Sequence, residues 1–153
     1  MGKRICFAAS SGGHLEEIAR LKDIILENES FLITEKSEFQ ELQLCQKVYH
    51  VAQINRKEIL FLLKFSILFF ISFVILLREK PDYIISTGAL ATYPICLLGK
   101  LMKKRIIYVE SFARVDGPSL TGKLMYKIAD LFIVQWKEML DFIPNAVYGG
   151  GIF

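Results

Sequence analysis

Short apolar runs alternate with amphipathic stretches along this chain, and the alternation predicts an α/β domain. The runs are four to six residues long and rich in Ile, Val, Phe and Tyr, which is typical of buried strands. They predict six strands, at residues 4–9, 31–34, 48–51, 83–86, 105–109 and 131–134. Because helical patterns separate most of these runs, we expect a Rossmann-like parallel sheet with helices on both faces.

Helical periodicity fills most of the gaps between the predicted strands. Leu15, Ile18, Leu21 and Ile25 fall on one face of a helix predicted from about residue 14 to residue 26. Shorter helices are predicted at 37–43, at about 93–102 and at 120–129, the last with Ser119 as its N-cap. The 153 residues suffice for a sizeable core, so we predict a single domain over 1–153.

The longest apolar stretch, residues 59–77, differs from the strand-like runs. Only Lys64, Ser66 and Ser72 among its nineteen residues are not apolar. As a helix it would be roughly 28 Å long, close to the ~30 Å thickness of a bilayer core. A full span would put the loops before and after it on opposite sides of the membrane, where they could not share one sheet. We therefore expect a helix lying in the membrane interface, with a buried or partner-covered helix and a full span as alternatives.

Basic and aromatic side chains on and beside this helix suit a membrane surface. Lys57, Lys64 and Arg78 fall near one helical stripe, where they would meet anionic head groups. Phe69 and Phe70 are the expected apolar contacts with lipid. No secretory signal fits the N-terminal residues, so we predict a monotopic or peripheral protein at the cytoplasmic face of the cell membrane.

Overall composition excludes several other classes of protein. The net charge of +3 is mild, so we expect no nucleic-acid partner. Cys6, Cys45 and Cys96 have no metal-binding spacing and are interpreted as reduced core thiols. We predict no metal site and no cofactor.

Polar and glycine residues follow the predicted strands where each one ends. Directly after the first strand come Ser10, Ser11, Gly12, Gly13 and His14. A glycine-rich turn between a strand and a helix presents backbone N–H groups to a phosphate, and a histidine there can also move a proton. The third glycine of the dinucleotide fingerprint and the lysine of a P-loop are both missing, which argues against NAD and against a P-loop nucleotide site. A tight turn that binds no ligand is the alternative.

The ends of later strands contribute further candidates. Thr87 and Gly88 follow the fourth strand, and ligands bind at the carboxyl ends of strands in open α/β sheets. Glu110, after the fifth strand, would hold a sugar hydroxyl or orient His14, or else be a surface carboxylate. Arg114 would meet a phosphate or pair with Glu110. A later aromatic residue, Trp136, would stack on a sugar or pack at the edge of the domain.

Several motifs together resemble a known family. The Gly-Gly-His opening and the Ile-Ser-Thr-Gly-Ala segment at 85–89 resemble the N-terminal domain of GT-B glycosyltransferases that act on polyprenyl-diphosphate sugars, including MurG. The segments at 110–115, 119–124 and 129–136 are similar to bacterial capsule and exopolysaccharide relatives of one eukaryotic protein. That protein is the acceptor-side, membrane-anchoring subunit of the two-subunit N-acetylglucosaminyltransferase of dolichol-linked oligosaccharide synthesis.

The resemblance implies a split enzyme. This chain would be the N-terminal half of a GT-B fold, and a separate catalytic subunit would carry the UDP-sugar site. The acceptor would be a polyprenyl-diphosphate-linked sugar, and the partners would also include membrane lipids. The helix at 59–77 would replace the N-terminal membrane anchor of the eukaryotic subunit.

Roles for individual residues complete this hypothesis, with His14 and Glu110 as the predicted catalytic residues. Ser11, Gly12, Gly13 and Arg114 would bind the acceptor diphosphate, and His14 would take the proton from the attacking hydroxyl. Thr87, Gly88 and Glu110 would line the acceptor pocket. The main alternative is a scaffold that anchors and activates the catalytic subunit without chemistry of its own. A self-sufficient small α/β enzyme and a structural membrane protein rank after it.

Overall fold

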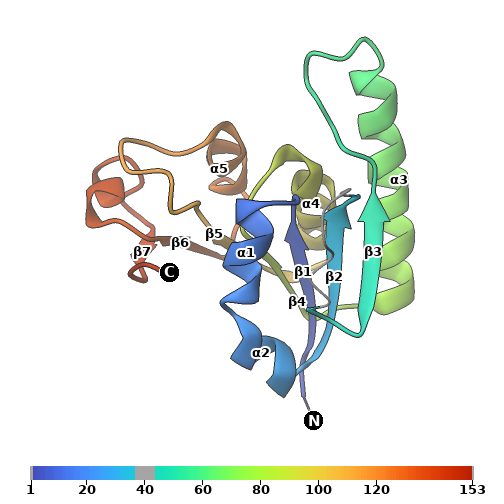
Figure 1. The fold of residues 1–153 in the computed structure, drawn as a ribbon, viewed down its shortest axis with the longest axis horizontal. Helices are drawn as coiled ribbons and strands as arrows, with labels where there is room; N and C mark the ends of the chain where they lie inside the picture. Colours follow the sequence, from blue (N-terminus) through green and yellow to red (C-terminus); the bar gives the residue numbers. More distant parts are fainter. Residues whose placement is uncertain (1, 37–43, 153) are drawn as a thin grey trace.

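One sheet of seven parallel strands organises the molecule (Figure 1). The computed structural model describes residues 2–36 and 44–152, so the helix predicted at 37–43 lies outside the described residues. The strands are β1 (Arg4–Ala9), β2 (Glu29–Glu35), β3 (Lys47–Val51), β4 (Tyr83–Ser86), β5 (Arg105–Val109), β6 (Leu131–Val134) and β7 (Val147–Tyr148). Their order is β3-β2-β1-β4-β5-β6-β7, and every neighbouring pair is parallel. The predicted Rossmann-like parallel sheet is confirmed.

Helices cover both faces of the sheet. α1 (Gly13–Ala19) and α2 (Lys22–Glu27) lie on one face, over a core that includes Phe7, Ile18 and Leu32. On the other face lie α3 (Phe61–Glu79), α4 (Tyr93–Leu101) and α5 (Leu120–Met125). A one-turn 3₁₀ helix, η1 (Leu90–Thr92), precedes α4, and a second, η2 (Lys137–Asp141), follows β6.

The helix boundaries differ from the prediction in three places. The single helix expected at 14–26 is two helices, because Leu21 departs from helical geometry at φ −89° and ψ 23°. α3 is displaced by two residues from the predicted 59–77, and Lys80, in the left-handed conformation, ends it at Glu79. The helix expected to reach residue 129 ends at Met125. Its predicted N-cap is confirmed, since the Ser119 hydroxyl accepts the Gly122 N–H at 2.8 Å.

α3 covers the sheet with only one of its faces. Its buried residues are Leu68, Ser72, Ile75, Leu76 and Glu79. The opposite face exposes large apolar side chains: Leu62, Leu63, Ile67, Phe70, Phe73, Val74 and Leu77. Among the described residues it is the one helix long and apolar enough to cross a membrane, judged by length and composition. Its first turns extend beyond the carboxyl ends of β1 to β3 (Figure 1).

The predicted lipid contacts on α3 divide between its two faces. Phe70 is 69% exposed, whereas Phe69 is half-buried with its ring edge-on to Phe65. Lys57 and Arg78 are exposed. Lys64 forms an ion pair with the carboxylate of Glu58, and its contact with lipid head groups stays a prediction.

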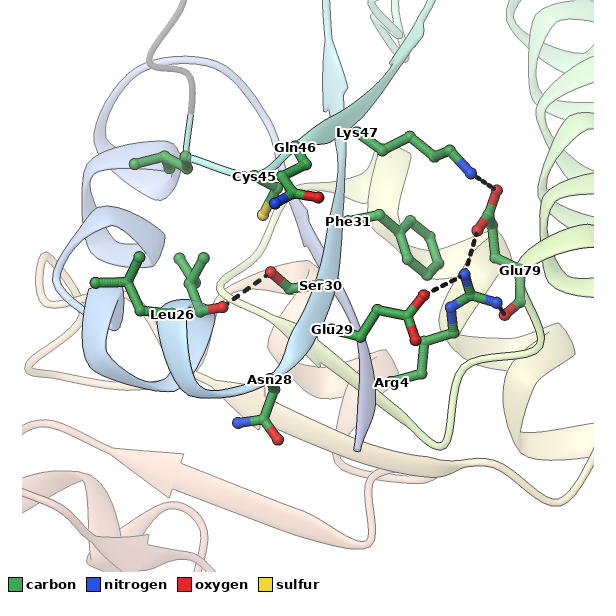
Figure 2. Close-up of a pocket in the computed structure, with 12 residues that line it drawn as sticks. Arg4, Leu26, Asn28, Glu29, Ser30, Phe31, Cys45, Gln46, Lys47 and Glu79 are labelled. Atoms are coloured by element: carbon green, nitrogen blue, oxygen red, sulfur yellow. Dashed lines mark hydrogen bonds and ion pairs between the residues drawn. The ribbon is translucent and has the colours of Figure 1, made fainter. Parts of the chain in front are cut away.

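The carboxylate of Glu79 fixes the last turn of α3 to the amino ends of the strands (Figure 2). It accepts a hydrogen bond from the Lys47 ammonium at 2.6 Å and another from the Tyr49 hydroxyl, and its second oxygen lies 3.5 Å from the Arg4 guanidinium. Burial alone would raise the pKa of Glu79, but these hydrogen bonds and the charges of Lys47 and Arg4 outweigh it and lower the pKa. Arg4 also bonds the Glu79 carbonyl at 2.8 Å and Glu29 at 2.6 Å. A cavity of about 400 Å³ lies beside this cluster.

The three cysteines are free and buried. Burial raises the pKa of the Cys6 and Cys45 thiols and brings that of Cys96 to about 12. All three therefore stay protonated at neutral pH, as expected of core thiols.

Candidate functional site

The candidate site lies where the strand order reverses, between β1 and β4. The chain turns from β1 into α1 through Gly12, whose φ of 83° and ψ of −141° suit glycine. The carbonyl of Gly12 accepts the N–H groups of Leu15 and Glu16, so that His14 sits in the first turn of α1. Ligands of open α/β sheets bind at such a reversal point, beyond the carboxyl ends of the strands.

Thr87 and Gly88 hold His14 from the β4 side. The Thr87 hydroxyl donates to the His14 carbonyl at 2.6 Å, and Thr87 is fully buried. Gly88 has a φ of 129°, and a Cβ placed on it would lie 2.7 Å from Cε1 of the His14 ring. Only a glycine therefore lets the imidazole lie against this turn. The structure thus brings together two motifs that the sequence placed 73 residues apart.

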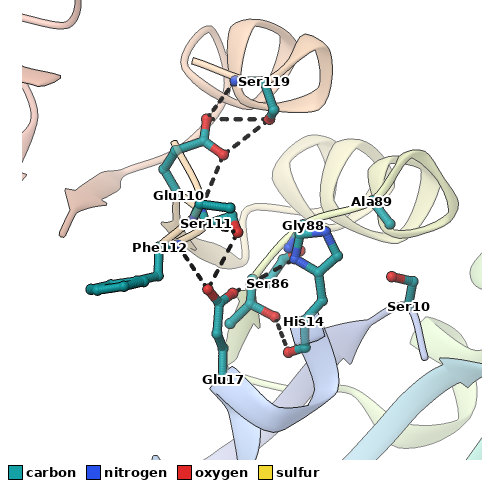
Figure 3. A network of polar contacts seen from close by, with 12 residues as sticks. Ser10, His14, Glu17, Ser86, Gly88, Ala89, Glu110, Ser111, Phe112 and Ser119 are labelled. Carbon is teal, nitrogen blue, oxygen red and sulfur yellow. Dashed lines mark hydrogen bonds and ion pairs between the residues drawn. The ribbon is translucent and has the colours of Figure 1, made fainter. Parts of the chain in front are cut away.

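Glu17 lies beneath the His14 ring, one helical turn further along α1 (Figure 3). Its Oε2 lies 3.6 Å from His14 Nδ1, and both atoms are buried without any other hydrogen-bond partner. The side chain of Glu17 is 2% exposed and that of His14 31%. Since Nδ1 is buried, Nε2 is the ring nitrogen that a ligand can reach.

The other oxygen of Glu17 is held from the β5 and β6 side. Oε1 accepts the Phe112 N–H at 2.8 Å, the Ser111 hydroxyl at 3.4 Å and the Gln135 amide at 3.4 Å. Gln135 is buried and also accepts the N–H of Ile152 at 2.9 Å. Glu17 thereby connects α1 to the loop after β5 and to the chain after β6.

Glu110 is placed differently from the prediction that it orients His14. It is 1% exposed, and its carboxylate accepts the Ser119 N–H at 3.0 Å and the Ser111 N–H at 3.1 Å. Side chains alternate along a strand, so Glu110 shares the face of Tyr108, against α5, whereas His14 and Glu17 come from α1 on the other face. Figure 3 shows its carboxylate directed at Ser119. Gly122 of α5 lies against this carboxylate. A Cβ at that position would lie 1.9 Å from Glu110 Oε2, so the absence of a side chain there makes room for Glu110.

A small cavity opens beside His14. It measures about 350 Å³ and is lined by His14, Ala89, Ser111, Ala113, Arg114, Ser119, Leu120 and Thr121. Arg114 is exposed, and it forms no ion pair with Glu110, both of them being described residues. Ser11, Gly12 and Gly13 lie outside the cavity lining, at the partly open turn before it. Across residues 2–36 and 44–152, no cluster of three or more His, Cys, Asp or Glu side chains could hold a metal ion.

Trp136 packs rather than facing this cavity. Its indole N–H donates to the Phe112 carbonyl at 2.7 Å, and the two rings lie 4.8 Å apart. Of the two roles considered for it, the structure supports packing.

Residues 5–152 match the protein-family model described as "Oligosaccharide biosynthesis protein Alg14 like". The chain belongs to this Alg14-like family. The mouse relative, "UDP-N-acetylglucosamine transferase subunit ALG14", is 34% identical over 181 residues, covering 97% of this chain and 82% of the relative. The protein of the same name from Saccharomyces cerevisiae is 49% identical over 55 residues, covering 35% of this chain and 23% of the relative. These Alg14 relatives are eukaryotic, and the capsule or exopolysaccharide setting stays a prediction.

Solved structures with little sequence similarity share the fold of this Alg14-like chain. MurG from Acinetobacter baumannii superposes with a TM-score of 0.74 at 13% identity, covering 90% of this chain and 43% of MurG. A UDP-N-acetylglucosamine 2-epimerase superposes with a TM-score of 0.75 at 13% identity, covering 97% of this chain and 46% of the epimerase. The chain thus corresponds to less than half of each solved chain, and the MurG-like fold is confirmed.

Proposed function

We propose that this chain is the acceptor- and membrane-binding subunit of a two-chain glycosyltransferase. The enzyme moves a sugar from a UDP-sugar to a polyprenyl-diphosphate-linked sugar, at the cytoplasmic face of the cell membrane, in bacterial capsule or exopolysaccharide synthesis. Curated Alg14 relatives are named as subunits of a UDP-N-acetylglucosamine transferase, which favours UDP-N-acetylglucosamine as the first donor to test. The observation that carries the proposal is the reach of His14 into an open cavity at the β1–β4 reversal point.

The proposed chemistry is an inverting displacement. The acceptor hydroxyl oxygen attacks the anomeric carbon of the donor sugar, and the UDP leaves with the electrons of the broken bond. His14 accepts the hydroxyl proton on Nε2 as that bond forms. The backbone N–H groups of Gly12 and Gly13, with Ser11 and Arg114, bind the acceptor diphosphate.

The acceptor lipid places this reaction at a membrane, and α3 supplies the attachment. Its exposed apolar face begins beside the carboxyl edge of the sheet, the edge that carries His14 (Figure 1). β1 and β4 come before and after α3 in the chain and are paired in one sheet, which favours a helix lying in the interface over one that spans. Lys57, Arg78 and Phe70 are exposed and available to lipid.

Sugar transfer from UDP-sugars to a polyprenyl-diphosphate sugar tests this proposal. The chain is assayed alone, then together with a chain that supplies the C-terminal half of a GT-B fold. Sugar transfer that occurs only when both chains are present supports a split enzyme. Sugar transfer by this chain without the second chain overturns the proposal. His14→Ala in the assembled pair should abolish transfer while the two chains still copurify, with His50→Ala, on β3, as the control.

The alternative is a scaffold that anchors and activates the catalytic subunit. The exposed apolar face of α3 would by itself suffice for that role. A His14→Ala pair with full transfer activity would favour the scaffold, because it would show that the imidazole takes no part in the chemistry.

A further inference from the structure

We propose that Glu17 is the positioning residue for His14, keeping the proton of the neutral imidazole on Nδ1 so that Nε2 can accept the hydroxyl proton. The inference deepens the proposed function and relies on it for the proton transfer. The orientation of the ring is a separate property that can be measured without any sugar transfer.

The two side chains have no other partner for the atoms that face each other. Glu17 Oε2 and His14 Nδ1 are both buried, 3.6 Å apart, and unpaired with any other atom. A buried polar atom without a hydrogen bond is costly, so this pair gains by closing the remaining gap. Contacts between catalytic groups are often long before substrate binds and shorten afterwards.

The carboxylate cannot easily rotate away from the ring. Three donors converge on Oε1, from Phe112, Ser111 and Gln135, and all three lie outside α1, after β5 or β6. With Oε1 fixed in this way, Oε2 must face Nδ1 (Figure 3). A carboxylate accepts hydrogen bonds and donates none, so the nitrogen facing it has to carry the proton.

This arrangement also stabilises the ring after the reaction. When Nε2 takes the hydroxyl proton, the imidazole becomes a cation with both nitrogens protonated. The adjacent buried carboxylate then faces that positive charge, as in other acid–base sites where a carboxylate orients a histidine. In this proposal Glu17 acts only through His14.

Glu17→Gln is the diagnostic variant, because the same three donors decide which way the amide points. Its oxygen replaces Oε1 beside the Phe112 N–H, which leaves the NH₂ group facing His14 Nδ1. That group can only donate, so it forces the ring proton onto Nε2 and blocks the base. We expect kcat of the assembled pair to fall by about 10²–10⁴-fold. KM for the acceptor and the melting temperature should be nearly unchanged.

Glu16→Gln is the matched control. It makes the same chemical change one residue earlier on α1, at an exposed side chain. Full activity is expected there. Glu17→Asp keeps the charge and should restore part of the activity lost in Glu17→Gln.

The tautomer of His14 is read from imidazole ¹⁵N shifts in wild type and Glu17→Gln at alkaline pH. The chain has two histidines, so the imidazole signals that remain in the His50→Gln variant belong to His14. An Nδ1–H tautomer in wild type that becomes Nε2–H in Glu17→Gln supports the proposal. An Nε2–H tautomer in wild type, or unchanged kcat in Glu17→Gln, overturns it. If Glu17→Gln fails to fold, the wild-type spectrum decides.

The same measurements separate this inference from the proposed function. A wild-type pair that transfers no sugar overturns the function, and the ¹⁵N shifts then still decide whether Glu17 orients the ring. A pair that is active with Glu17→Gln keeps the function and removes the positioning role.

Discussion

The side-chain hydroxyl of Thr87 donates a hydrogen bond to the main-chain carbonyl of His14, at 2.6 Å. The bond joins the loop after β4 to the first turn of α1, across the point where the strand order reverses. It fixes the backbone of His14, whereas Glu17 faces the imidazole ring. Backbone and side chain of the proposed base are thus held by different elements.

Thr87→Val tests the backbone part of this arrangement. Valine has the shape of threonine and lacks the hydroxyl, so the variant loses one buried hydrogen bond. We expect the free energy of unfolding to fall by about 0.5–1.5 kcal/mol, measured by urea denaturation. Thr87→Ser keeps the hydroxyl and should lose less. A loss of stability in Thr87→Ser with none in Thr87→Val would show that the methyl group, and not the hydrogen bond, matters.

Gly88→Ala should disable the site. The added Cβ meets the His14 ring at 2.7 Å, and the φ of 129° is unfavourable for alanine. Gly150→Ala is the matched control, since Gly150 also has a positive φ, of 77°, but nothing lies within 4 Å of its Cβ position. We expect both to lose about 1–3 kcal/mol of stability and only Gly88→Ala to lose transfer activity. An active Gly88→Ala pair would show that the ring is free to move.

Glu110→Ala should reveal a structural carboxylate. Glu110 is buried and accepts N–H groups from Ser111 and Ser119, and both would be left without a partner. We expect a loss of about 2–3 kcal/mol in urea denaturation. Glu138→Ala, an exposed carboxylate on η2, should change stability by less than about 0.5 kcal/mol. Equal stability of the two variants would contradict the role given to Glu110.

Glu79 should make stability depend on pH in the acid range. Its pKa in the folded protein is lowered below the ordinary value of 4.5. The unfolded chain therefore binds the proton more readily, and the stabilisation is complete above 4.5 and is lost as pH falls through the folded-state pKa. The pKa of Asp130 is also lowered, so wild type must be compared with Glu79→Gln. A constant difference in stability between these two proteins from neutral to acid pH would contradict the prediction.

Leu62→Glu should weaken membrane binding. Leu62 is 75% exposed on α3, and Leu26, 80% exposed on α2, lies on the opposite face of the sheet. Burying a leucine in lipid contributes about 1.5–3 kcal/mol, so we expect Leu62→Glu to reduce partitioning onto anionic vesicles at least tenfold. Leu26→Glu should bind like wild type. Equal binding by wild type, Leu62→Glu and Leu26→Glu would exclude α3 as the attachment.

The strands were predictable because their apolar runs end sharply. Four of the six predicted strands, β1, β4, β5 and β6, have the predicted bounds. The end of α3 was harder to predict, because the apolar run stops at Leu77 whereas the helix continues through the charged residues Arg78 and Glu79. Glu79 is helical and buried because Lys47 and Tyr49, from β3, reach it.

The site could be located from sequence but its internal contacts could not. The turn at Gly12 and the loop at Thr87 were both placed at the carboxyl edge, where they meet. Glu17 was missed because a carboxylate three residues after a histidine on a helix usually faces solvent. The signal available was its position, i+3 from His14, which puts both on one face of α1. The prediction that Glu110 orients His14 was wrong because side chains alternate along a strand. Glu110 therefore lies on the same face of the sheet as Tyr108, toward α5.

Strand β1 joins the two ends of the molecule that the proposed reaction must coordinate. At its start, Arg4 binds both the carboxylate and the carbonyl of Glu79, the last residue of α3. At its other end the chain passes directly into the turn that carries His14. A strand hydrogen-bonded on both sides extends and bends little, so under the proposed membrane attachment the depth of α3 in lipid would set the height of the imidazole above the bilayer. The enzyme would then select acceptors by the distance of their sugar from the bilayer, because only a sugar at the height of the imidazole could react.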